Sequence, residues 1–222
     1  MTLSAAPTPL IDLAQVSKRF GERKIGAAGR AMQKLGLSKQ PAITRAVDNV
    51  DLIVNPGEVV GLVGESGCGK STLGRIAAGL LTPSGGEVRI NGVRPPDMNS
   101  AAAHAARLTV QMIFQDPYAS LNPRLRVDEI VGEAARIHGL VDNAGFDDYV
   151  SAQMERAGLD PALRQRYPHQ FSGGQRQRIG IARALAVQPS MLVCDEAVAA
   201  LDVSIQAQIL NLFMDLREEL NL

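Results

Sequence analysis

Apolar and polar residues follow two kinds of pattern along this chain, one typical of strands and one typical of helices. Residues 58–63 (EVVGLV) and 190–195 (SMLVCD) are nearly continuous apolar runs, as expected for strands that are covered on both faces. Residues 11–20 mix apolar and polar positions in the manner of an edge strand. Shorter strand-like runs are expected at 46–54, 86–92 and 108–114.

Segments with helical periodicity separate these strands. Helices are predicted from about 70 to 79, over 126–138 and 146–157, from the FSGGQ stretch (171–175) to about 186, and over 204–220. Strands that alternate with helices predict a mainly parallel sheet, and therefore an α/β fold.

Composition restricts the classes of protein that fit. The chain has 222 residues, of which 45% are hydrophobic and 21% charged, and its formal net charge is zero. Such a chain can form one large globular domain, and its neutral charge gives no electrostatic reason for nucleic acid as a partner. No apolar run approaches the roughly 18 residues of a membrane span. Two cysteines are too few for a disulfide framework, which fits a reducing cytosol.

A basic segment at 21–44 interrupts the first part of the domain. It has five lysines and arginines against one acid, Glu22. A solvated insertion explains it, and so does a basic arm that touches a partner or lipid headgroups.

A phosphate-binding loop follows the first continuous apolar run. GESGCGKS, residues 64–71, satisfies G-x-x-x-x-G-K-[S/T] between a predicted strand and a predicted helix. Lys70 is expected to reach the β- and γ-phosphates, Ser71 to bind Mg²⁺ and Thr72 to contact the α-phosphate. The nucleotide-binding residues predicted here are Gly64, Glu65, Ser66, Gly67, Cys68, Gly69, Lys70, Ser71 and Thr72.

Acidic and amide side chains end two of the other predicted strands. Asp195 ends a strand, where an acid can hold the Mg²⁺ shell, and Glu196 can orient or deprotonate an attacking water. Helix capping is the alternative for this carboxylate pair. Gln115 ends QMIFQ and can contact both Mg²⁺ and the water, although a glutamine at a strand end is unremarkable by itself. Glu196, Gln115 and Lys70 are the catalytic candidates, and Ser71, Gln115 and Asp195 the metal candidates.

A second helix start has the features of an anion site. Ser172, Gly173, Gly174 and Gln175 open a predicted helix, where free N–H groups and the helix dipole attract anions. If the domain binds one nucleotide at its phosphate loop, no ligand remains for this second site.

The ordered set GESGCGKST, Gln115, FSGGQ and CDEAVAALD resembles the ATP-binding subunit of an ABC transporter, over residues 11–222. QDPYASLNPR and LDVSIQAQILNL resemble the oligopeptide, dipeptide and nickel importers. The resemblance implies one domain over 1–222 with a RecA-like P-loop core, an antiparallel β subdomain and an inserted helical subdomain at 116–172.

In that family two ATP-binding domains meet head to tail around two ATP molecules. The resemblance therefore implies that Ser172, Gly173, Gly174 and Gln175 bind the γ-phosphate on the partner subunit. Asp202 would lie at the same interface and couple the two sites. Phe20 stands where the family stacks an aromatic ring on adenine, and an ordinary core aromatic is the alternative.

The implied function is hydrolysis of ATP, with Mg²⁺, to power import of peptides or related small solutes. The implied partners are a second ATPase subunit, two integral-membrane permease subunits and, indirectly, an extracytoplasmic solute-binding protein. A heterodimer of two ATPase subunits is favoured over a homodimer. The implied location of the subunit is the cytoplasmic face of the bacterial inner membrane. A soluble ABC-type ATPase of translation or DNA repair, and a non-hydrolysing ATP-binding regulator, are the alternatives.

The family pattern continues past Leu222 into a further strand and a histidine that contacts the γ-phosphate. We therefore expect this chain to be C-terminally incomplete and to hydrolyse ATP poorly by itself. None of its own three histidines is a catalytic candidate: His138 suits a helix end, and no metal-ligand spacing links His104, His138 and His169.

Overall fold

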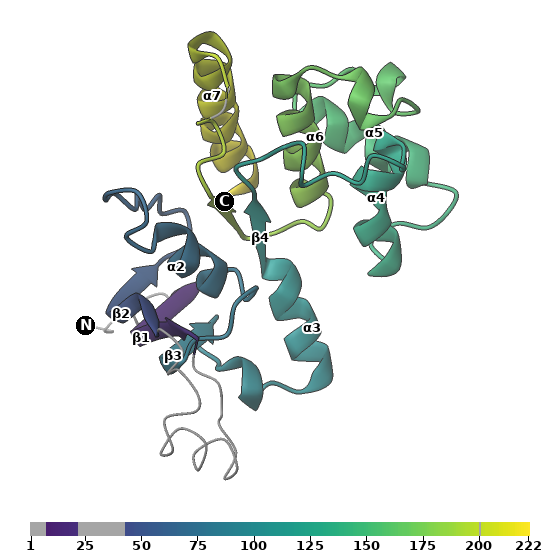
Figure 1. Cartoon of the computed structure of the whole chain (residues 1–222). Coiled ribbons are helices and arrows are strands. Elements are labelled where there is room, and N and C mark those ends of the chain that lie inside the picture. The colour runs from purple at the N-terminus through teal and green to yellow at the C-terminus, as the bar shows by residue number, and fades with distance from the viewer. Residues whose placement is uncertain (1–7, 22–42, 200) are drawn as a thin grey trace, which may run out of the picture.

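A three-stranded antiparallel sheet forms the N-terminal part of the fold (Figure 1). The computed structural model describes residues 8–21, 43–199 and 201–222, so most of the expected basic insertion at 21–44 lies outside the described residues. The strands are β1 (Ile11–Phe20), β2 (Thr44–Val54) and β3 (Gly85–Ile90), in the order β2-β1-β3. The strands expected at 46–54 and 86–92 are thereby confirmed.

The interpretation of 11–20 as an edge strand is wrong, because β1 lies between β2 and β3. Ile11 and Leu13 are buried, but the next buried position is Val16. A register shift lies between Leu13 and Val16, where Gln15 has a φ of 49° and its N–H donates to the carboxylate of Asp51 at 2.7 Å. This β-bulge moves the apolar position by one residue, and the sequence therefore loses the simple alternation of a half-buried strand.

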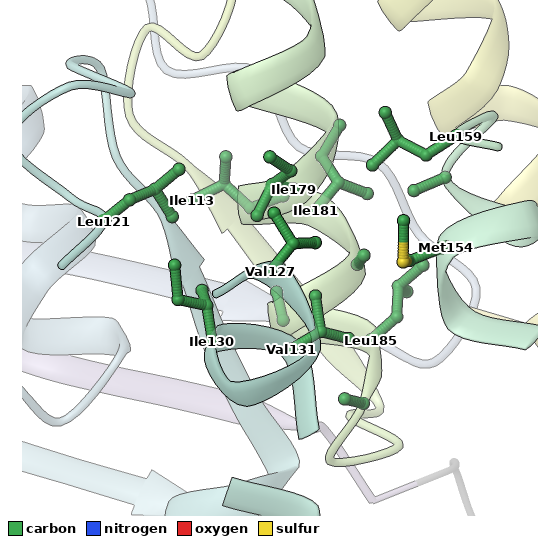
Figure 2. Packing of buried hydrophobic residues seen from close by; sticks show 14 of the residues in the cluster. Ile113, Leu121, Val127, Ile130, Val131, Met154, Leu159, Ile179, Ile181 and Leu185 are labelled. Atoms are coloured by element: carbon green, nitrogen blue, oxygen red, sulfur yellow. The ribbon is translucent and has the colours of Figure 1, made fainter. Parts of the chain in front are cut away.

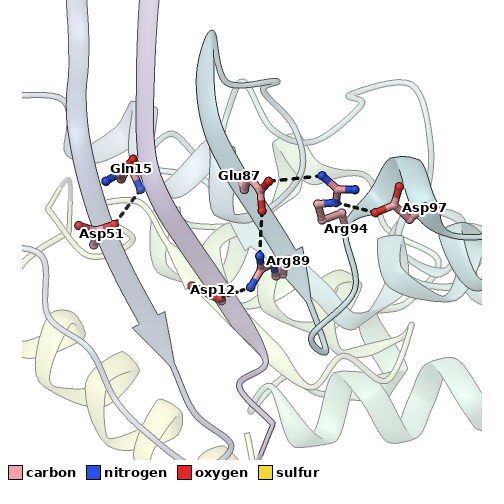
Figure 3. Close-up of polar contacts among 7 residues, drawn as sticks. All are labelled: Asp12, Gln15, Asp51, Glu87, Arg89, Arg94 and Asp97. Atoms are coloured by element: carbon pink, nitrogen blue, oxygen red, sulfur yellow. Dashed lines mark hydrogen bonds and ion pairs between the residues drawn. The ribbon is translucent and has the colours of Figure 1, made fainter.

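Ion pairs connect β1, β3 and the segment after β3 (Figure 3). The guanidinium of Arg89 lies 2.9 Å from Glu87 and 3.6 Å from Asp12. Arg94 bridges Glu87 and Asp97, and its hydrogen bond to Asp97 is the main cause that raises the pKa of Arg94. These side chains are largely exposed, so water and salt screen the pairs and each contributes little to stability.

Residues 58–63 do not form the buried strand that the sequence predicts. Their apolar side chains are open to solvent, with Val59 69% and Val63 97% exposed. A strand forms where partner strands take its N–H and C=O groups. In the described part of the chain neither sheet includes 58–63, and the segment leads into the phosphate loop without a ladder.

A pair of parallel strands forms the centre of the fold. β4 (Val110–Ile113) pairs with β5 (Met191–Cys194) in the register Val110↔Met191 to Ile113↔Cys194. Both strands are shorter than their predicted ranges, and within the described residues this pair is the whole of the parallel sheet. The helix α2 (Lys70–Ala77) follows the phosphate loop as predicted.

One helix was missed by sequence reasoning. α3 (Ser100–Thr109) includes the alanine-rich stretch and leads directly into β4. Asn99 caps it, since its side-chain oxygen accepts a hydrogen bond from the N–H of Ala102 at 2.8 Å. Asparagine before an alanine-rich run is a recognisable helix start, so the signal was present in the sequence.

Three helices pack around a shared apolar core beside this strand pair (Figures 1 and 2). They are α4 (Val127–Ile137), α5 (Phe146–Arg156) and α6 (Gly173–Leu185), and each agrees with its predicted range to within about two residues. Val127 and Val131 of α4 meet Ile179 and Ile181 of α6, all four fully buried (Figure 2). The bounds of 116–172 for a helical subdomain stay a prediction.

The chain closes with α7 (Val203–Leu220), which also matches its predicted range. Ile209 and Leu216 bury one face of this helix in the same core as α6. Three short 3₁₀ helices complete the secondary structure of the described residues: η1 (Pro95–Asp97), η2 (Pro161–Leu163) and η3 (Pro168–Gln170).

The contact between α4 and α5 makes a stability prediction possible. A Cβ on Gly132 would lie 2.4 Å from the Phe146 ring and 2.7 Å from Val150, whereas a Cβ on Gly180 of α6 would meet nothing within 4 Å. Gly132→Ala is therefore expected to lower the free energy of unfolding by about 1–3 kcal/mol, because the helices must separate. Gly180→Ala is expected to raise it by about 0.5–1 kcal/mol, because alanine has the higher helix propensity.

Urea unfolding followed by circular dichroism measures both changes, and each glycine variant serves as the control for the other. Equal effects of the two substitutions would contradict the close approach of α4 to α5 at Gly132.

Candidate functional site

The phosphate loop has the backbone that its glycines predict. Gly67 and Gly69 have φ values of 81° and 104°, in the left-handed region that favours glycine. Gly69 also precedes the first residue of α2, and a Cβ there would lie 2.1 Å from the carbonyl oxygen of Ala46 in β2. A larger residue at 69 is thus excluded by both dihedral angle and space.

Lys70 is held over the loop by backbone carbonyl groups. Its Nζ donates to the carbonyl oxygen of Gly64 at 2.7 Å and to that of Glu65 at 2.8 Å. The sulfur of Cys68 lies 3.9 Å from the same Nζ. The ammonium group is therefore positioned at the loop, where it can exchange carbonyl partners for phosphate oxygens. Ser71 and Thr72 follow in the first turn of α2.

The two other catalytic candidates are in direct contact. The amide nitrogen of Gln115, which follows β4, donates to the carboxylate of Glu196, which follows β5, at 2.7 Å. Glu196 has a φ of 48°, a conformation uncommon for a residue with a side chain. Such strain persists where the surroundings fix it, and it occurs often at functional sites.

Asp195 continues the ladder between the two parallel strands. Its N–H donates to the carbonyl oxygen of Ile113 at 3.0 Å, and its side chain is only 10% exposed. The nearest basic group is Arg75 of α2, whose guanidinium lies 3.9 Å from the carboxylate. Sequence reasoning did not identify Arg75 as a residue of the site. Its position in α2, five residues after Lys70, was the available signal.

Lys70, alone among the loop residues, shares one cavity of about 490 Å³ with the two carboxylates. Lys70, Asp195 and Glu196 border it, and its other walls are mainly apolar side chains of 58–62, β5 and α7. A second cavity of about 380 Å³ lies between the loop and β2, bordered by Arg45, Cys68 and Lys70. Lys70 borders both cavities. It therefore lies between the carboxylates of the larger cavity and the Arg45 and Cys68 side chains of the smaller one.

The two cysteines differ in their surroundings. Cys68 is exposed in the phosphate loop. Cys194 borders the larger cavity and can be reached by solvent there, but protein atoms surround most of its side chain. This desolvation raises the pKa of the Cys194 thiol to about 12, because burial disfavours the thiolate.

The FSGGQ stretch starts α6 with a reciprocal cap. The hydroxyl of Ser172 accepts from the N–H of Gln175 at 3.3 Å, and the side chain of Gln175 accepts from the N–H of Ser172 at 3.0 Å. Gly174 packs closely on Ile205 of α7, because a Cβ there would lie 2.8 Å from that side chain. The residues of this cap do not border the cavity around Lys70.

The two arginines after FSGGQ make contacts within the fold. Arg176 is buried, donates from Nε to the carbonyl oxygen of Pro168 at 2.7 Å, and lies 4.0 Å from the centre of the Tyr118 ring. Arg178 donates to the carbonyl oxygen of Ala157 at 2.9 Å. Arg176 thus ties the start of α6 to the segment after Gln115, a contact between distant segments that the sequence does not signal.

Two further candidates lie at the edges of this region. Asp202 is exposed at the start of α7, with no side-chain hydrogen bond to the helix. Phe20 ends β1 opposite Thr44, is 42% exposed, and has the Lys18 ammonium 5.3 Å from its ring centre. An exposed ring at this place agrees better with a stacking role than with a core role, and the role itself stays a prediction.

The described residues bring together no group of three or more histidine, cysteine or acidic side chains suited to a metal ion. Mg²⁺ needs no such group, because it binds through one or two carboxylates together with substrate phosphates. Ser71, Gln115 and Asp195 offer the hard oxygen donors that it prefers. In the part of the chain that the structure describes, no helix has the length and apolarity to cross a membrane.

Comparison with known proteins gives a consistent picture. The family model described as "ABC transporter" matches residues 47–199. A putative peptide import ATP-binding protein of Brucella abortus is 50% identical over 181 residues, which are 81% of this chain and 54% of that protein. The oligopeptide transport ATP-binding protein OppF of Salmonella typhimurium is 49% identical over 183 residues, or 82% and 55% of the two chains. The chain thus spans about half the length of these relatives.

A solved structure shares the fold over nearly the whole chain. The dimeric, post-hydrolysis state of the ATP-binding cassette MJ0796 bound to ADP and Pi has a TM-score of 0.76 and 29% identity, covering 94% of this chain and 83% of that one. The α/β fold expected from the sequence is therefore confirmed as a RecA-like P-loop fold with an antiparallel sheet. With its phosphate loop, its Gln115–Glu196 contact and a family match over more than half its length, the chain belongs to the ABC transporter family.

Proposed function

We propose that this chain is the ATP-binding and ATP-hydrolysing subunit of an importer for peptides or related small solutes. The observation that carries the proposal is the contact of Gln115 with Glu196 beside the phosphate loop, where Lys70 and Glu196 border one cavity. The names of the similar chains, which are peptide import ATP-binding proteins, support the class of solute.

Nucleotide binding rests on the loop and its lysine. The backbone N–H groups of 64–71 surround the phosphates, and Lys70 exchanges its two carbonyl partners for β- and γ-phosphate oxygens. Phe20 stacks on the adenine ring. Mg²⁺, held by Ser71, Gln115 and Asp195, supplies neutralisation of phosphate charge when it is bound.

Glu196 acts as the general base. Its carboxylate accepts a proton from a water molecule as the water oxygen forms a bond to the γ-phosphorus. The bond from that phosphorus to the bridging oxygen breaks, and ADP leaves with the electron pair. The Gln115 amide orients the carboxylate and thereby fixes the position of the water.

The capped start of α6 acts on a second subunit. Residues 172–175 do not border the Lys70 cavity of their own chain. The cap already uses the N–H groups of Ser172 and Gln175, so the N–H groups of Gly173 and Gly174 in the first turn of α6 are the ones that suit a phosphate held elsewhere. We assign Ser172, Gly173, Gly174 and Gln175 to the γ-phosphate on the partner subunit, and Asp202 to the interface that links the two sites. The dimeric state of the similar cassette supports this arrangement.

The remaining partners follow from the proposed transport. Two integral-membrane permease subunits would carry the solute, and a solute-binding protein would deliver it from outside. The subunit would then lie on the cytoplasmic face of the bacterial inner membrane. Co-purification with permease subunits tests this; recovery only with ribosomes or DNA-repair proteins would favour a soluble ABC-type ATPase.

Glu196→Gln should strongly reduce turnover and leave ATP binding intact. The amide keeps the shape of the side chain and can still contact Gln115, but it cannot accept a proton. Phosphate release by the dimer with its membrane subunits is expected to fall by about 10²–10⁴-fold, the usual contribution of a general base. Binding of a fluorescent ATP analogue should be unchanged.

The matched control for this substitution is Glu155→Gln, which removes an exposed carboxylate from α5. Near-normal phosphate release by the Glu196→Gln complex, or an equal loss in the control, would remove Glu196 from its assigned role. Absence of turnover in the unsubstituted complex would favour a non-hydrolysing regulator.

The two cysteines should react with thiol reagents at different rates. Since the raised pKa of Cys194 is about 12, its thiol stays protonated below that pH, and alkylation is expected to be slow from pH 7 to 9 and to accelerate only near pH 12. Cys68, exposed beside Lys70, should react faster, and ATP with Mg²⁺ should protect it.

Mass spectrometry of alkylated peptides measures both rates, with Cys194→Ser as the control in which Cys68 alone reacts. Equal rates at Cys68 with and without ATP and Mg²⁺ would contradict its assigned place at the phosphates. Faster reaction of Cys194 at pH 8 would contradict its desolvation.

A further inference from the structure

Two of the chain's three histidines, His104 and His138, are in contact with each other. Nε2 of His104, in the middle of α3, lies 2.6 Å from Nδ1 of His138, which ends α4. The ring centres are 4.5 Å apart and the planes make an angle of 63°. The fold thus joins two imidazoles that are 34 residues apart, although their spacing in the sequence predicts no shared site.

Charges of both signs lie near this pair, and a solvated ion can reach it. His138 stands at the carboxyl end of α4, where the helix dipole places partial negative charge. The guanidinium of Arg136, two residues before it, lies over the Phe146 ring at 5.1 Å. His104 is exposed, so a solvated ion can reach the pair. Arg107 and Glu133, each about one turn away on their helices, are charged residues of opposite sign.

We propose that His104 and His138 form a binding site for a borderline divalent cation such as Zn²⁺. Neutral imidazole is a preferred ligand for zinc, copper and nickel ions. At Zn–N distances of about 2.0–2.1 Å and a tetrahedral angle, the two nitrogens would be about 3.3 Å apart. Small rotations of the two side chains provide the extra separation.

The site has two protein ligands, and water completes the coordination. No third histidine, cysteine or acidic side chain joins the pair among the described residues. The expected affinity is therefore well below that of a closed structural zinc site, which has four protein ligands. A site of this kind responds to a changing supply of metal and is not filled permanently.

Occupancy would tie two separate parts of the fold together. α3 follows the antiparallel sheet and leads into β4, whereas α4 belongs to the helical group that packs on α6 (Figure 1). A bound ion would restrain α4 relative to α3. This role is independent of the proposed transport function, since neither histidine borders the cavity around Lys70.

Protection from diethyl pyrocarbonate tests the site residue by residue. The full chain carrying Cys68→Ser and Cys194→Ser removes the thiols, which also bind zinc, and mass spectrometry then follows carbethoxylation of each histidine at fixed pH. Zn²⁺ is expected to slow modification of His104 and His138 and to leave His169 unchanged. Slowing of none, or of all three equally, would overturn the proposal.

Calorimetric titration with Zn²⁺ on the same background supplies the matched comparison. His104→Gln and His138→Gln should each weaken binding by about 10–100-fold or more, since loss of even an outer-shell partner costs this much. His169→Gln, whose ring stacks on Tyr167 elsewhere, should bind like the parent. Circular dichroism confirms that each variant is folded, and equal Zn²⁺ affinity in all three would show that the histidine pair is only a hydrogen bond.

Discussion

The parallel pairing of β4 with β5 is the constraint on which the geometry of the candidate site depends. Ile113 and Cys194 are direct partners in this pair, and the N–H of Asp195 continues the ladder to the carbonyl of Ile113. Gln115 and Glu196 each follow two residues later, and the shared register leaves their side chains 2.7 Å apart. A shift of one residue in either strand would turn one of these side chains to the opposite face.

Close backbone approach is the second requirement of the site. Gly69 fits against the Ala46 carbonyl, which seats the start of α2 on the antiparallel sheet, and Lys70 then lies over the loop. Two other glycines also allow close packing: Gly174 lies against α7, and Gly132 lies against α5. Gly69 thereby joins the phosphate loop to β2, Gly174 joins the capped start of α6 to α7, and Gly132 joins α4 to α5.

Much of the fold and of the candidate site could be predicted from the chain alone. The phosphate loop, α2, α4 to α7 and most strands lie close to their expected ranges, because periodicity, glycines and caps are local signals. Residues 11–20 and 58–63 could not be placed correctly. In the first case a bulge at Gln15 disturbs the pattern of a central strand, and in the second an apolar run has no partner strand among the described residues. Strand formation is a property of pairs of segments, whereas the sequence reports on one segment at a time.

The sequence by itself determined the chemistry available to this protein: a lysine in a glycine loop, a paired Asp195 and Glu196, an amide at Gln115 and a second helix start with the sequence features of an anion site. Only the tertiary structure decided which of these groups meet. It brings the amide of Gln115 to the carboxylate of Glu196, places the guanidinium of Arg176 over the Tyr118 ring, and brings His104 to His138. The physical reason is that side-chain identity and local caps act within a few residues. Contacts across 34 to 81 residues depend on strand register and helix packing, which the whole chain settles together.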